Sequence, residues 1–170
     1  MQAISFSKLA IAGGIVLLLG SCDAPTNGQG GFQKQYVVAR DALESGHYAR
    51  ASRAYGQLMQ TAGPLRPRLQ LEYAHSELRA GNYAEAARLA SDLAENQKGQ
   101  DRAAALSVQG TAQHELGLTM LQKGDAKSGK GLLTAAEKAL SEVVKTHPDL
   151  DPLGSLARRR AAIQARLKRL

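Results

Sequence analysis

The sequence has little of several residue types on which whole classes of function depend. It contains one cysteine, Cys22, and no tryptophan, and aromatic residues make up 4% of its 170 residues. A single cysteine cannot form an intrachain disulfide, and a thiolate metal site needs more than one. So few aromatic side chains also leave little surface on which nucleic-acid bases could stack. The stability of a folded domain must therefore come from packing.

A short apolar run at residues 9–19 follows Lys8. A basic start, an apolar core of about 7–15 residues and small residues at the cut are typical of a secretory signal peptide. The run ends in Leu-Gly-Ser-Cys at residues 19–22, which resembles the lipobox of bacterial lipoproteins. That resemblance implies a signal peptide over 1–21, cleavage before Cys22, and a thioether-linked diacylglycerol and an N-acyl chain on this cysteine. An ordinary secreted protein with a chance cysteine is the alternative.

Residues 22–31 are rich in glycine and small polar residues, which predicts a lipidated flexible tether. Its nine residues after Cys22 reach at most about 30 Å, so the folded part should stay close to a membrane. In some Gram-negative bacteria, an aspartate at the position of Asp23 resembles a signal for retention in the inner membrane. We therefore expect a lipid-anchored protein on the periplasmic side of the cell envelope, with the choice between inner and outer membrane open.

From Phe32 onward, alanine and leucine recur at helical spacing, and no stretch alternates as a strand would. The pattern predicts an all-α protein, with a helical domain over 32–152 and a basic amphipathic helix over 153–170. Short turns containing Gly, Asn and Asp separate the helices. The predicted helices are about 33–45, 49–61, 67–80, 84–96, 101–122, 126–147 and 153–169.

An internal repeat is present, because Gly-His-Tyr-Ala-Arg-Ala at 46–51 recurs as Gly-Asn-Tyr-Ala-Glu-Ala at 81–86. A weaker echo, Gly-Asp-Ala, follows at 124–126. This pattern resembles the tetratricopeptide repeat (TPR), a helix–turn–helix unit of about 34 residues. The resemblance implies a TPR-like α-solenoid of three antiparallel helix pairs plus a C-terminal capping helix. Ala39, Ala74 and Gly117 match small residues of the family and are expected to let the first helices approach closely. The other matching positions are Ala51 and Ala86, which are small, and Tyr55, which is aromatic.

The third unit departs from the family pattern. Ala126 stands where the turn aromatic belongs, and Gly129 stands where the alanine belongs. No unit has the family's early tryptophan. The third pair is therefore either a true repeat or an ordinary helical hairpin stacked on two repeats.

Acidic residues are missing from the C-terminal end of the chain. All 15 Asp and Glu residues lie at or before Asp151, and six basic residues follow it. Between residues 23 and 151 the chain has 15 basic and 15 acidic residues. The basic excess behind the pI near 9.8 therefore belongs to the last helix. Because a signal peptide directs the chain out of the cytoplasm, no nucleic-acid partner is expected.

The predicted last helix is amphipathic at about 100° per residue. Its leucines and isoleucine cluster on one side, and Arg158, Arg159, Arg166 and Arg169 point away from it. Arg160 falls on the apolar side, where its stem can lie flat while its head reaches water. The helix is either a cap with a solvated polar face or a cap that also contacts anionic lipid, near which each basic residue contributes about 1 kcal/mol.

No catalytic, metal or nucleotide site is predicted. Residues 124–130 match the first seven positions of a P-loop, but Gly131 stands where that loop needs Ser or Thr, and a helix rather than a strand precedes it. The four histidines share no metal-ligand spacing, and no Ser-His-Asp order or carboxylate pair suggests catalysis. We expect a protein that is not an enzyme and has no cofactor beyond the lipid on Cys22.

The TPR resemblance also implies a concave groove, lined by the first helix of each pair, that holds extended peptides or helices of other proteins. Val37 and Glu72 stand where the family's lysine–asparagine carboxylate clamp needs polar or basic residues, so that clamp is absent. The other groove positions suit an acidic segment with an apolar anchor, because arginine pairs bidentately with carboxylates. The alternative is that the arginines only solvate the inner wall. The selected positions are Tyr36, Arg40, Glu44, Arg68, Leu71, His75, Arg79, Thr111, His114, Leu118 and Gln122.

These observations predict a membrane-tethered adaptor or scaffold for an envelope process such as assembly, secretion or cell-wall construction. Its expected partner is an acidic peptide or helix of another protein. One alternative is a rigid spacer whose basic last helix binds anionic lipid or cell-wall polymer. A narrower form of the adaptor is a pilotin-like chaperone of one pilus or secretion component.

Overall fold

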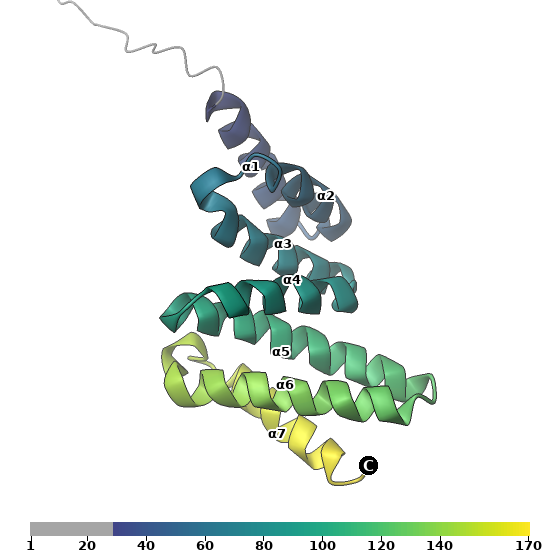
Figure 1. Cartoon of the computed structure of the whole chain (residues 1–170). Helices are drawn as coiled ribbons and strands as arrows, with labels where there is room; N and C mark the ends of the chain where they lie inside the picture. Colours follow the sequence, from purple (N-terminus) through teal and green to yellow (C-terminus); the bar gives the residue numbers. More distant parts are fainter. Residues whose placement is uncertain (1–28) are drawn as a thin grey trace, which may run out of the picture.

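The computed structural model describes residues 29–170, and Figure 1 shows them as a stack of helices. The predicted signal peptide, Cys22 and its lipid, and most of the tether lie outside these residues. Within them the all-α class is confirmed, with seven α-helices and no strand. The helices are α1 (Gln29–Glu44), α2 (Tyr48–Leu58), α3 (Arg66–Ala80), α4 (Tyr83–Asn96), α5 (Gly99–Gln122), α6 (Ala126–Thr146) and α7 (Ser155–Leu167), with short 3-10 turns η1 (Gly63–Leu65) and η2 (Pro148–Leu150).

Each helix packs against the next one in the chain, and α1 and α7 lie at opposite ends of the stack (Figure 1). Some contacts skip a helix: α3 touches α5, α5 touches α7, and Tyr36 of α1 bonds to Glu72 of α3. Side chains on α1, α3, α5 and α7 therefore face a common side of the stack, which is where the cavities described below lie.

Three turns share one geometry that explains the repeated sequence. Gly46, Gly81 and Gly124 adopt positive φ angles of 77°, 84° and 85°. After each glycine, the next backbone N–H donates to the carbonyl five residues earlier, at 2.8–3.0 Å. This is the Schellman end of a helix, which favours glycine because other residues are strained at positive φ. The next helix then begins within two residues, so each repeat motif marks a tight helix–helix turn.

The helices pack closely because their contact faces carry small residues. Ala39, Ala51, Ala74 and Ala86 are fully buried. Tyr55 is the largest of the fully buried side chains and fills the space between the first three helices.

Helices α5 and α6 come closest where they carry glycine. A Cβ on Gly117 would lie 3.1 Å from Leu133 and 3.2 Å from the Gly129 carbonyl oxygen. Gly117 therefore lets α5 approach α6 closely. Gly129 plays the reciprocal role, since its Cβ would lie 2.6 Å from Leu121.

Helix α1 begins at Gln29 rather than about 33, so the prediction of a flexible tether is wrong for residues 29–31, which are helical. Two further helix boundaries differ from the prediction for identifiable reasons. Helix α2 ends at Leu58 rather than near 61, because the chain turns there into the Pro-containing η1. Helix α7 begins at Ser155 rather than 153. Asp151 accepts the backbone N–H groups of Leu156 and Ala157, each at 2.9 Å, and so fixes the first turn of α7.

Candidate functional site

Two adjoining cavities open on the side shared by α1, α3, α5 and α7. The first has a volume of about 610 Å³ and lies between α1, α3 and α5, with Leu150 of η2 at its edge. The second, of about 510 Å³, lies between α3, α5 and the start of α7. His75, Arg79, Ser107 and Val108 line both cavities, which together are called the groove below.

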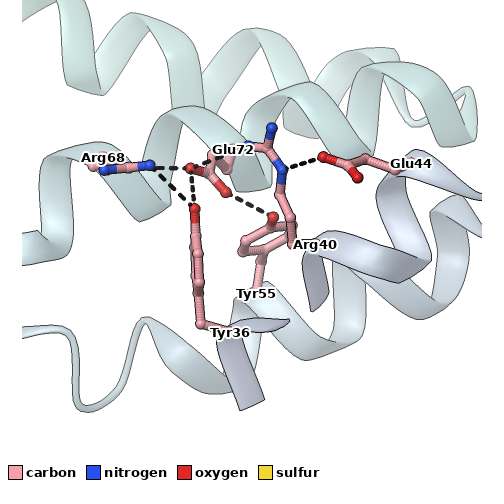
Figure 2. A network of polar contacts seen from close by, with 6 residues as sticks. All are labelled: Tyr36, Arg40, Glu44, Tyr55, Arg68 and Glu72. Atoms are coloured by element: carbon pink, nitrogen blue, oxygen red, sulfur yellow. Dashed lines mark hydrogen bonds and ion pairs between the residues drawn. The ribbon is translucent and has the colours of Figure 1, made fainter. Parts of the chain in front are cut away.

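Several predicted groove residues do line it, and others do not. Arg40, Glu44, Leu71, His75, Arg79 and Thr111 are among the lining residues of the two cavities. Tyr36 and Arg68 lie beside the first cavity in a polar network (Figure 2). His114, Leu118 and Gln122 line neither cavity.

The network centres on Glu72 of α3, whose carboxylate joins three helices (Figure 2). The hydroxyls of Tyr36 (α1) and Tyr55 (α2) donate to its two oxygens at 2.9 and 2.7 Å. Arg68 donates to the same carboxylate at 3.3 Å. Burial raises the pKa of Tyr55, and its bond to Glu72 raises it further, so this phenol stays a donor.

This network neutralises two arginines on which the predicted groove depended. Arg40 pairs with Glu44 at 2.6 Å and lies 3.8 Å from Glu72. The hydrogen bond to Glu44 and the charge of Glu72 raise the pKa of Arg40. The groove therefore has two acids at its α1 edge rather than one, because Glu72, noted in the sequence only as incompatible with the clamp, also lines the first cavity. Its i,i+4 spacing from Arg68 was the available signal.

Arg79 is different, because no carboxylate lies within 4.0 Å of its guanidinium anywhere in residues 29–170. Its carbon centre stands 4.8 Å from the centroid of the Tyr48 ring, and it donates to the Tyr48 hydroxyl. The neighbouring His75 has a lowered pKa because of burial first and then of the charges of Arg79 and Arg40. At neutral pH, Arg79 is therefore the uncompensated cation of the groove.

The far end of the predicted groove is covered by α7. Arg159 lies 2.7 Å from Nδ1 of His114 and forms an ion pair with Glu115. Burial and the charge of Arg159 lower the pKa of His114. Leu118 packs beneath α7 in the cluster that includes Ile163. The expectation that His114 and Leu118 line an open groove is therefore wrong, because α7 covers that surface.

The predicted basic surface of α7 is divided by the structure. Arg158, Arg166 and Arg169 are exposed as predicted. Arg159 does not point away, since it binds Glu115. Arg160 was expected to reach water, but its guanidinium pairs with Glu137 of α6 at 2.8 Å.

Residues 29–170 contain no group of three or more His, Cys, Asp or Glu side chains placed to hold a metal ion. None of the helices in this range is long and apolar enough to cross a membrane. No protein-family model, curated protein or solved structure matches the chain.

Proposed function

We propose that this chain is a non-catalytic adaptor that binds a short segment of a partner protein in the groove. The observation that carries this proposal is Arg79, an uncompensated cation placed where the two cavities meet, with Leu71 and Val108 among the residues that line them. A carboxylate on the ligand would pair with its guanidinium, and an adjacent aliphatic side chain would be buried against Leu71 and Val108. An acidic residue beside an apolar one is thus the chemistry that the groove fits.

The extent of the groove limits the ligand. Leu150 and the start of α7 bound the two cavities at their far end. Arg40 and Arg68 already have acidic partners inside the protein. A short segment with one acidic anchor therefore fits better than a long, highly acidic peptide.

We also infer that the helices form a TPR-like solenoid, with pairs α1/α2, α3/α4 and α5/α6 and with α7 as the cap. Support comes from the three glycine turns with one hydrogen-bonding pattern and from the packing of each helix on the next. The turn at Gly124 shares this pattern although its sequence lacks the aromatic. That supports counting the third pair as part of the same plan.

The lipobox and tether supply the cellular setting of the proposal. A lipidated Cys22 would hold the adaptor on the periplasmic side of the envelope, where assembly, secretion or cell-wall machinery would be its context. A pilotin-like chaperone of one secretion component is the narrowest version of this function.

The test is crosslinking in intact cells followed by mass spectrometry of the captured proteins. Wild type is compared with Arg79→Glu and with Arg53→Glu, which changes an exposed arginine of α2 outside the groove. We expect one protein to be captured by wild type and by Arg53→Glu and lost with Arg79→Glu. Equal capture by all three chains would contradict groove binding.

A further inference from the structure

The outward side of α7 is a second surface, separate from the groove, and is called the basic end face here. It lies at the end of the stack opposite α1 (Figure 1). All of its members are exposed. They are the cations Arg158, Lys168 and Arg169, with the exposed Arg166 at the edge nearest His114 of α5, and the alanines Ala157, Ala161, Ala162 and Ala165.

The cations of this face have no acidic partner. Within residues 29–170, no Asp or Glu oxygen lies within 4.0 Å of any of the four. Arg158 donates only to the backbone carbonyl of Leu153, at 2.7 Å. By contrast, the inward-facing Arg159 and Arg160 are paired with Glu115 and Glu137. The unpaired cations of α7 therefore all lie on its exposed surface, with Arg166 at the edge nearest α5.

The surface between these cations carries only short side chains. Its exposed side chains at positions 157, 161, 162 and 165 are all alanine. Alanines also form most of the buried contacts between neighbouring helices of this stack, for example Ala74, Ala90 and Ala105. Such side chains let helix axes approach to about 8 Å. The alanines of this surface thus allow a second helix to pack closely, as in the interior of the stack, and the cations around them resemble the charged rim of an interface.

A lipid bilayer fits this surface less well than a helix does. The large apolar side chains of α7 are Leu156, Ile163 and Leu167, and they pack against the helix stack. They are therefore not free to enter a membrane as those of an interfacial helix would. Helix α7 also lies at the end of the stack opposite α1, the helix that follows the predicted tether (Figure 1).

We propose that the basic end face docks an acidic amphipathic helix of a partner protein, which adds one more layer to the stack. Acidic side chains on the edges of that helix would pair with Arg158, Arg166 and Arg169, and small residues along its centre would contact the alanines. A second copy bound through the same face would place these cations against one another. This docking is independent of the groove and of its ligand.

The experiment uses the full chain and a fluorescent, helix-forming peptide with glutamates on both edges of an alanine stripe. One variant is Arg158→Glu/Arg166→Glu/Arg169→Glu. Its matched control, Arg50→Glu/Arg53→Glu/Lys127→Glu, makes the same change of charge at exposed positions of α2 and α6. A second variant, Ala161→Gln/Ala165→Gln, keeps all charges but places longer side chains in the middle of the face. Circular dichroism establishes that each chain is folded.

We expect wild type and the charge control to bind the peptide with equal affinity. The reversed variant should bind it with an affinity at least about tenfold lower. The glutamine variant should also lose affinity, since the added side chains keep the helices apart. A lysine version of the peptide should not bind.

Four results would overturn the proposal. The peptide binds no better to wild type than to the reversed variant. The glutamine variant binds as tightly as wild type, so that charge alone is recognised. Wild type sediments with phosphatidylglycerol vesicles through Arg158, Arg166 and Arg169 but does not bind the peptide, which indicates a lipid surface. Wild type self-associates and charge reversal makes it monomeric, which indicates a second copy.

Discussion

The hydroxyl of Tyr55 lies 2.7 Å from Oε2 of Glu72, and this hydrogen bond joins α2 to α3 beside the groove. The other carboxylate oxygen of Glu72 accepts from Tyr36 of α1. One acidic side chain therefore connects three helices and also lies within reach of Arg40 and Arg68. The N-terminal wall of the groove is built around this single carboxylate (Figure 2).

Replacing Glu72 by Ala should lower the free energy of unfolding by about 2–3 kcal/mol, because the buried Tyr55 hydroxyl loses its acceptor. Glu44→Ala is the matched control, since it removes an exposed partner of the same Arg40 and should cost no more than about 0.5 kcal/mol. Urea denaturation followed by circular dichroism measures both. Equal costs for the two variants would show that the network adds no stability.

Gly110→Ala should destabilise the protein by about 1–3 kcal/mol, although alanine favours helices. A Cβ at this position would lie 2.8 Å from Leu140 and 3.2 Å from the Ala136 carbonyl oxygen. Gly131→Ala in α6 is the control, because a Cβ there has nothing within 4 Å. That control should gain up to about 1 kcal/mol. Opposite signs in urea denaturation are the expected result, and a loss in both variants would contradict it.

Acid should weaken the attachment of α7. The pKa of Glu137 is lowered first by its hydrogen bond from Arg160. Desolvation raises the pKa of Asp151, but the N–H groups of Leu156 and Ala157 outweigh it and leave the pKa below its ordinary 3.8. A carboxyl group whose pKa is lowered by folding stabilises the fold fully when the pH is above its ordinary, unfolded-state pKa. This contribution is lost as the pH falls through the folded-state pKa.

The measurement for this prediction is urea denaturation at several pH values between about 5 and 3. Stability should fall across this range, and Glu137→Gln with Asp151→Asn should make the fall shallower. An unchanged pH profile in that double variant would show that other carboxylates are responsible.

His75 should give stability a separate dependence on pH. The residue is exposed on α3, but partial desolvation in the groove and then the charge of Arg79 lower its pKa from the ordinary 6.5. The unfolded chain therefore binds a proton at a higher pH than the folded one, and stability decreases as the pH falls below 6.5 until the folded-state pKa is passed. His75→Gln should reduce the decrease measured by denaturation between about pH 6.5 and pH 5. The same decrease in wild type and variant would exclude His75 as its source.

The local part of this structure was predictable from the sequence. Apolar periodicity located all seven helices of residues 29–170, and the glycines at 46, 81 and 124 marked the turns. Both signals come from interactions within a few residues, which a sequence displays directly. Boundaries were wrong where a local cap or turn sets them, as Asp151 does for the start of α7 by accepting the N–H groups of Leu156 and Ala157.

The candidate site was predicted less well, because its charges depend on neighbours far away in the chain. Glu72 meets Tyr36 across 36 residues, and Arg159 meets His114 across 45. Periodicity assigns a residue to a helix face but does not say which opposing side chain neutralises it. Arg40 and Arg68 were therefore counted as free cations, and His114 was placed in a groove that α7 covers.

The packing of each helix on its neighbours in the chain also bears on how the protein folds. Most contacts join segments that are adjacent along the chain, and the contacts that skip a helix are few. Such a low contact order requires little loop closure before contacts form, and helical proteins of this kind fold in microseconds to milliseconds. A chain that is released end first can therefore acquire structure helix by helix, before its last helix is available.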